Sequence, residues 1–146
     1  MTTRSFAQVV GIVFILVGVV GFFPGMKSAP LPGLPHLAVD GGYGLLFGLF
    51  PINWLHNLVH LGIGIAAWSS SQDYDSARQF VRGLTFFYGA LAVMGLIPVL
   101  NMAFGLIPLY GHDVWLHAGI AAMAAYFGFG QRIEPVEARE SYRQAA

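Results

Sequence analysis

The sequence predicts an all-α fold, an integral membrane four-helix bundle built from two parallel two-helix repeats. Three observations lead to this prediction: long segments without charge, four apolar runs of helix length, and a motif that occurs twice. Charged residues make up 10% of the chain and hydrophobic residues 56%, against roughly 25% charged residues in an ordinary soluble domain. No charged residue occurs between Gly41 and Gln72, and between Gly83 and Gln131 the single one is Asp113.

The four apolar runs lie at residues 6–23, 52–68, 80–97 and 114–129. A bilayer core ~30 Å thick needs about 20 apolar residues per helix, so each run predicts a membrane span. The first run is longer than the ~7–15 residues of a signal-peptide core, and we expect it to be retained. Segments 44–50 and 101–107 are too short to span, and we expect helical stubs there. Pro51 and Pro108 then suit the first turn of the following helices.

The repeated motif is Phe-Gly-Leu-x-Pro followed, after eight residues, by His-x-Gly-Ile. It begins at Phe47 and again at Phe104, with a constant offset of 57 residues. It predicts a duplication with repeat one at 6–69 and repeat two at 80–129, together a four-span membrane domain over 1–130. Two spans per repeat make the copies parallel, related by an axis along the membrane normal. Residues 131–146 are expected to form a polar cytoplasmic tail.

Basic residues predict the orientation. Lys27 falls on one side of the predicted spans, and all the arginines fall on the other: Arg4, Arg78, Arg82, Arg132, Arg139 and Arg143. The positive-inside rule therefore places both termini in the cytoplasm. We expect the bacterial inner (plasma) membrane, or a thylakoid membrane if the host is photosynthetic. A formal net charge of zero, with no basic stripe to neutralise phosphates, argues against nucleic acid. The absence of cysteine excludes disulfides and thiolate metal sites.

Polar side chains gather on the second and fourth predicted helices at matched heights. Helical spacing puts several on one face of each helix: Asn53, His56, Asn57 and His60 on the second, and Asp113 and His117 on the fourth. Polar groups inside a membrane are costly and usually face the interior of a bundle. These polar side chains predict either a functional site or contacts that serve only to pack the helices.

Three interpretations of these residues remain open. In the packing interpretation, Asn53 and Asp113 cap helices, Asn57 is structural, and neutral histidines form hydrogen bonds between helices. In a second, His60 and His117 are axial ligands of haem, or one of them ligates a chlorophyll. In a third, His56, His60, Asp113 and His117 bind zinc or iron.

The motifs Asn-x-x-His-Asn-x-x-His at 53–60 and Asp-x-x-Leu-His at 113–117 resemble those of a bacterial family catalogued as a domain of unknown function. The resemblance covers nearly all of the chain except the polar tail. It implies a four-helix membrane protein with these polar positions as its hallmark, and it implies no activity. We therefore expect a non-enzymatic subunit or scaffold of a larger membrane complex, or a self-associating protein. A haem- or chlorophyll-binding protein and a metal-binding protein are the alternatives.

Overall fold

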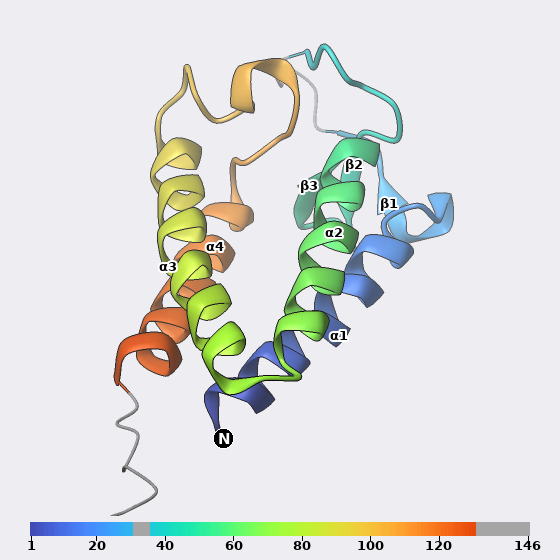
Figure 1. Cartoon of the computed structure of the whole chain (residues 1–146). Coiled ribbons are helices and arrows are strands. Elements are labelled where there is room, and N and C mark those ends of the chain that lie inside the picture. Colours follow the sequence, from blue (N-terminus) through green and yellow to red (C-terminus); the bar gives the residue numbers. More distant parts are fainter. Residues whose placement is uncertain (31–35, 131–146) are drawn as a thin grey trace, which may run out of the picture.

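The computed structural model describes residues 1–30 and 36–130, and the tail predicted at 131–146 lies outside them. Four α-helices make up most of the described chain (Figure 1): α1 (Thr3–Val20), α2 (Trp54–Ser70), α3 (Tyr74–Leu96) and α4 (His112–Ala125). A π-helix at Tyr126–Gly130 continues α4. The predicted helical fold is therefore observed, and α1 and α3 are long and apolar enough to cross a membrane.

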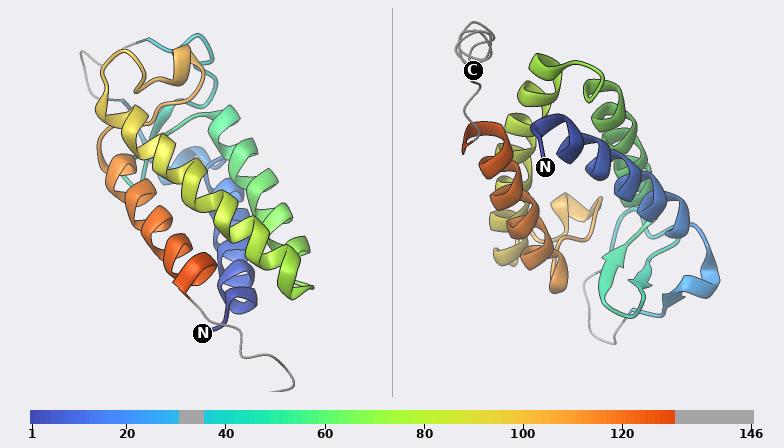
Figure 2. Two further views of the ribbon diagram at one scale, coloured as in Figure 1. Left: turned by 60° about the vertical axis from the view of Figure 1, so that its left-hand side comes forward. Right: turned by 90° about the horizontal axis from the view of Figure 1, so that it is seen from below.

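The helices pack as two hairpins, α1 with α2 and α3 with α4, which stand side by side in both views of Figure 2. The hairpins meet where α3 packs against α1 and α2. Close backbone approach holds the first hairpin together. A Cβ atom on Gly11 would lie 2.9 Å from the backbone nitrogen of Trp68, and one on Gly64 would lie 2.8 Å from the backbone nitrogen of Ile15.

The segment predicted as a helical stub at 44–50 is a β-hairpin instead. Strands β2 (Gly44–Leu46) and β3 (Phe50–Ile52) pair antiparallel, and β1 (Lys27–Ser28) adds to the outer edge of β2. The turn holds Phe47 at φ 52° and Gly48 at φ 72°. Two consecutive positive φ angles are what a type I′ β-turn requires, and the N–H of Leu49 donates to the carbonyl of Leu46 across this turn. Such angles are incompatible with a right-handed helix.

The equivalent segment of the second half, 101–107, contains a single 3-10 turn, Ala103–Gly105, rather than a longer helical stub. Its Phe104 and Gly105 have φ angles of 60° and 84°. Both copies of the Phe-Gly motif thus form a left-handed turn. The predicted positions of Pro51 and Pro108 are wrong, because α2 begins at Trp54 and α4 at His112, and both prolines precede the helices.

The two hairpins bury equivalent positions. Each buried residue of α3 lies 74 positions after a buried residue in or next to α1: Thr3 and Ala77, Ala7 and Val81, Val10 and Leu84, Phe14 and Tyr88, Gly18 and Ala92, Gly21 and Gly95. Four buried pairs of α2 and α4 are separated by 57 positions: His56 and Asp113, Asn57 and Val114, His60 and His117, Ala67 and Ala124. This agreement supports the duplication predicted from the motif.

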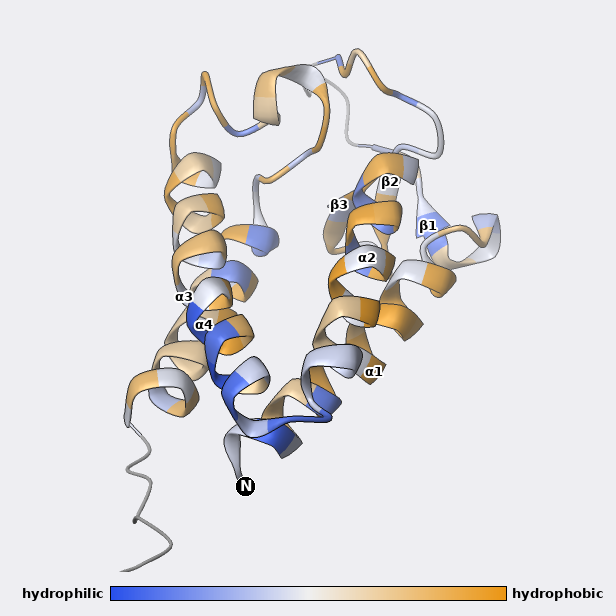
Figure 3. Ribbon diagram, viewed as in Figure 1, coloured by the Kyte–Doolittle hydropathy of each residue, from blue (hydrophilic) through white to orange (hydrophobic). Residues whose placement is uncertain are grey.

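Large apolar side chains are exposed on all four helices, and much of the helical ribbon is coloured as hydrophobic (Figure 3). One example per helix is Leu16, Ile65, Phe86 and Trp115, which are 57%, 59%, 71% and 73% exposed. The buried residues include asparagine, histidine and aspartate. Large apolar side chains exposed on every helix, with ionisable groups buried between the helices, are the distribution expected of a protein whose surroundings are lipid.

Candidate functional site

Asn53 anchors the outer end of α2, and it is the N-cap of this helix. Its side-chain oxygen accepts a hydrogen bond from the backbone N–H of His56 at 2.8 Å. Its amide nitrogen donates to the carbonyl oxygens of Val39 at 2.8 Å and Leu106 at 2.6 Å. One buried side chain therefore starts the helix and ties together the loops of both halves above it.

Asp113 does not cap α4, so the capping role that the packing interpretation gave it is wrong. The N-cap of α4 is Gly111, at φ 68°, and Asp113 lies in the first turn of the helix. Its side chain is 2% exposed, and its Oδ2 atom has no hydrogen-bond partner among the described residues. The carboxylate consequently points into the protein with an acceptor available.

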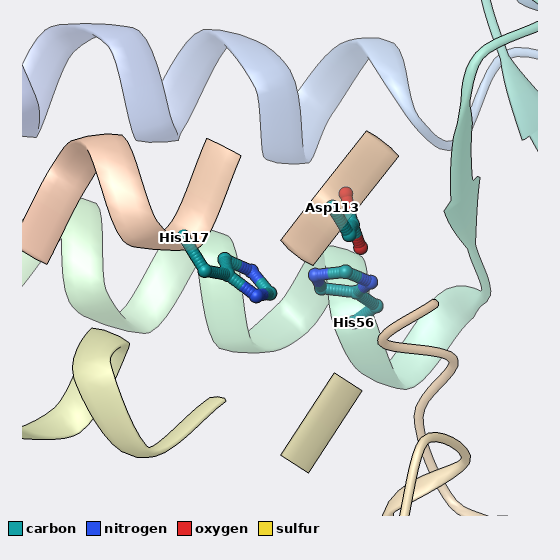
Figure 4. Close-up of side chains that lie close together, drawn as sticks. All are labelled: His56, Asp113 and His117. Carbon is teal, nitrogen blue, oxygen red and sulfur yellow. The ribbon is translucent and has the colours of Figure 1, made fainter. Parts of the chain in front are cut away.

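His56, Asp113 and His117 come together between the two hairpins (Figure 4). One ligand atom from each side chain can be chosen so that all three lie within 4.8 Å of one another. His56 comes from α2, while Asp113 and His117 are separated by one turn of α4, so that they share a face. The sequence pattern predicted these three residues as neighbours, and the structure brings them together.

His60, the fourth residue of the predicted metal set, lies beside this cluster and does not belong to the group of three. Its ring stacks on that of His56, with centroids 4.5 Å apart and an interplanar angle of 24°. The ring of Phe14 packs against the ring of His60 at 5.3 Å between centroids. The ring of His56 lies 6.5 Å from that of His117 in the second hairpin.

Two aromatic residues complete the surroundings of the histidine rings, and the spacing of the polar residues along the chain does not reveal them. Phe14 packs on His60 at 5.3 Å and 53°, and Tyr88 packs on His117 at 5.2 Å and 55°. Phe14 and Tyr88 contact each other at 5.7 Å. These are equivalent residues of α1 and α3, so extending the repeat from the second helices to the first would have found them.

The cluster and two neighbouring residues of α2, Asn57 and His60, contain several buried polar atoms without a hydrogen-bond partner among the described residues. These are the Nδ1 atoms of His56, His60 and His117, Oδ2 of Asp113, and both amide atoms of Asn57. An unsatisfied buried polar atom costs about 1–3 kcal/mol, and native proteins contain few of them. Such a concentration at one place is the pattern expected of a site that binds something.

The donor set suits a divalent transition metal. Imidazole and carboxylate groups are acceptable ligands for zinc and iron. Ligand atoms around a tetrahedral zinc ion lie about 3.4 Å apart, since the bonds are about 2.1 Å long. The cluster, at up to 4.8 Å, would need to contract by an amount that side-chain rotation can supply.

Above the cluster, a pair of tyrosines joins the loops of the two halves. The hydroxyl oxygens of Tyr43 and Tyr110 lie 2.6 Å apart. Burial, followed by this hydrogen bond, raises the pKa of Tyr110 above its usual range. Tyr110 therefore remains a neutral phenol, and the contact with Tyr43 links the loops without adding a charge near Asp113.

The chain belongs to the family described as domain of unknown function DUF4383, whose model matches residues 4–130. This assignment agrees with the resemblance noted from the histidine and asparagine motifs. Comparison with curated proteins and with solved structures finds no significant match.

Proposed function

We propose that this protein is a four-span protein of the bacterial inner membrane that binds one divalent transition metal ion between its two helical hairpins. The ligands are His56, Asp113 and His117, and the ion is zinc or iron. The observation that carries the proposal is that one ligand atom from each of three buried residues lies within 4.8 Å of the others. Each of these side chains has a buried polar atom without a described hydrogen-bond partner.

The exposed apolar faces of the four helices support membrane insertion. Two helices meet the length and hydropathy of a span. The 17 residues of α2, and the 14 residues of α4 followed by the π-helix, carry equally exposed apolar side chains. Arg4 donates to the carbonyl of Ser71, and Arg82 to that of Gly128. These arginines lie at one end of the bundle, which the positive-inside rule places in the cytoplasm.

Two histidines and one carboxylate leave coordination positions open. Structural zinc sites usually have four protein ligands, whereas catalytic zinc sites have three and non-haem iron sites often have two histidines and a carboxylate. The proposed site has three, so it resembles the open class. An ion held there can bind a further small ligand, and His60 is the nearest side chain that could supply a fourth.

Ring packing favours a metal ion over a tetrapyrrole. A macrocycle held by His60 and His117 needs a flat space between the two rings. Each of these rings instead packs on an aromatic side chain, Phe14 or Tyr88, and those two side chains contact each other. Binding a haem or chlorophyll would require these rings to separate, whereas a metal ion requires a smaller adjustment.

A scaffold role in a membrane complex is the second candidate. The observation that favours it is the exposure of Val99 and Phe104, at 82% and 79%, in the loop between α3 and α4. Apolar side chains this exposed outside the helices suit contact with the membrane interface or with another protein. Under this role the histidines serve packing, and their replacement changes stability without changing metal content.

The test is metal binding by the full-length protein purified in mild detergent. After treatment with a chelator, the protein is titrated with Co²⁺, whose visible absorption reports histidine and carboxylate coordination. We expect one Co²⁺ ion per chain, displaced by Zn²⁺. Changes outside a ligand set typically weaken metal binding about 10–100-fold. His117→Ala and Asp113→Asn remove ligands, so each should weaken Co²⁺ binding by more than this.

His36→Ala is the matched control, because His36 is an exposed histidine away from the cluster. Its metal affinity should equal that of the unmodified protein. Failure of Co²⁺ to bind stoichiometrically, or an equal loss in His36→Ala, contradicts the proposal. A Soret or chlorophyll band that disappears in His60→Ala would instead establish the tetrapyrrole alternative.

A further inference from the structure

Two grooves flank the histidine cluster, one between α1 and α4 and one between α2 and α3. Their volumes are about 630 Å³ and about 220 Å³. All ten residues that line the smaller groove have their repeat equivalents in the larger one. Examples are Phe87 and Val13, Leu91 and Val17, and Val59 and Leu116. The two grooves are therefore the same surface in two copies.

Connectivity explains why one copy is wider. A three-residue loop joins α2 to α3 and holds these helices in contact. No such link joins α1 to α4, and α1 packs mainly on α2 and α3. The larger groove also extends farther along the bundle, past Val10 and Ile120 to Phe6 and Phe127. From Val17 to Phe6 it follows about 16 Å of α1, at 1.5 Å per residue.

The larger groove has one polar region. Among its lining residues, His60, Asp113 and His117 carry ionisable or hydrogen-bonding side chains, and the remainder are apolar. All three are more than nine-tenths buried. Each has an atom without a described partner: Nδ1 of His60, Oδ2 of Asp113 and Nδ1 of His117. A molecule in the groove would meet unpaired polar groups at one place and hydrocarbon elsewhere.

From these features we infer that the α1–α4 groove binds a lipid-soluble quinone. The head group lies at His60 and His117, and the apolar tail follows α1 toward Phe6. A quinone carbonyl accepts a hydrogen bond from a histidine N–H, and its flat ring matches the aromatic surface that Phe14 presents.

The charge of the polar region disfavours an anionic head group there. Asp113 supplies a carboxylate, and no lysine or arginine lines the groove, so a fatty acid or phospholipid phosphate at His60 and His117 would have no cationic side chain to pair with. The α-amino group of Met1, which also lines the groove, lies toward the other end, beyond Phe6. A neutral head group avoids this cost. The head group shares His117 with the proposed metal site, but His60, Phe14 and the apolar length of the groove lie outside that site, so the inference goes beyond the proposed metal function.

The experiment measures retention of ubiquinone-2, which has a short isoprenoid tail, by the full-length protein in nanodiscs of neutral lipid. We expect saturable binding of one quinone per chain above the partition into empty nanodiscs. Val13→Trp, which fills the larger groove, should weaken binding at least tenfold. Phe87→Trp, which places the same residue at the equivalent position of the smaller groove, should leave it unchanged. His60→Phe, which keeps the ring but removes the hydrogen bond, should weaken it severalfold.

Co²⁺ binding by the same variants separates this inference from the metal proposal. Val13→Trp should keep the metal affinity of the unmodified protein, which also shows that it is folded. Binding that does not saturate, or that Phe87→Trp weakens as much as Val13→Trp, overturns the inference. Stronger displacement of the quinone by palmitate than by a second neutral quinone overturns it as well, because the occupant would then be an anionic lipid.

Discussion

The two helical hairpins bury the same positions but carry different side chains at the centre of the molecule. Both halves carry small or apolar residues at most equivalent buried positions, as at Ala67 and Ala124. The histidine pair His60 and His117 is retained in both halves. Four buried pairs differ in chemistry: Thr3 and Ala77, His56 and Asp113, Asn57 and Val114, and Phe14 and Tyr88.

The difference shows that packing and chemistry place separate demands on a duplicated fold. Packing requires that a given position be buried, and it tolerates several side chains of suitable size. A metal site requires particular donor atoms. In the proposed metal site the first hairpin supplies the ring of His56 and the second supplies Asp113 and His117, so neither half alone contains the ligand set. The proposed site would therefore depend on the difference between the two halves.

Exchanging the divergent ligands should have the largest effect. In the double variant His56→Asp with Asp113→His, the repeat symmetry places a matching set at positions 56, 113 and 60. We expect Co²⁺ binding to survive in the double variant. Adding His60→Ala should then weaken it about 100-fold or more, while adding His117→Ala should have little effect. Co²⁺ titration of the two triple variants measures this reversal.

The unexchanged protein supplies the reference, since its binding should depend on His117 far more than on His60. If the exchanged protein continues to depend on His117, then the two halves are not interchangeable at the metal. The asymmetry would then arise from the backbone and not from the two exchanged side chains.

The equivalent glycines Gly21 and Gly95 should differ in their response to alanine. A Cβ atom on Gly95 would meet the backbone carbonyl of Leu109 and the side chain of Val114, whereas one on Gly21 would meet the amide of Asn57. A backbone group yields less than a side chain. Gly95→Ala should therefore lower the free energy of unfolding by about 1–3 kcal/mol, and Gly21→Ala by less.

Thermal unfolding followed by circular dichroism in detergent measures both variants. Gly89→Ala is the control in the same helix as Gly95, because a Cβ atom there would have nothing within 4 Å. It should leave stability unchanged or raise it slightly. An equal effect of alanine at Gly89 and Gly95 would show that close backbone approach does not hold the second hairpin together.

The smallest effect is expected for the replacement of Asn57 by the residue at its equivalent position, Val114. Asn57 is fully buried, and neither amide atom has a described partner. Asn57→Val makes the first half like the second and should raise the free energy of unfolding by about 1 kcal/mol. The reverse change, Val114→Asn, should lower it by about 1–3 kcal/mol. Chemical unfolding in mixed micelles, with Co²⁺ affinity as a check on the site, distinguishes the two.

Loss of stability in Asn57→Val would contradict this expectation. It would show that the amide of Asn57 has a bound partner, such as a water molecule or a ligand of the adjacent cluster. Unchanged Co²⁺ affinity in both variants would place Asn57 outside the metal site, in the structural role that its position in the motif predicts.

Sequence reasoning located the four helices and the buried polar positions because hydrophobic periodicity and local spacing report them directly. Asn53, His56 and His60 follow one another at helical intervals, so their common face did not depend on the rest of the fold. The segment 44–50 was predicted wrongly for a related reason. Its apolar residues suit a short helix or a strand equally, and the left-handed turn at Phe47 and Gly48 decides between them.

The sequence by itself determined that this protein is helical and apolar, that its motif is repeated, and that His60 and His117 lie at matched heights. These properties depend only on residue type and on spacing along one chain. Only the tertiary structure decided which of the four predicted ligands come together and which of two equivalent grooves is wide. Both depend on how the hairpins meet. The α2–α3 loop holds one pair of helices in contact and leaves α1 and α4 apart, and no local pattern encodes that separation.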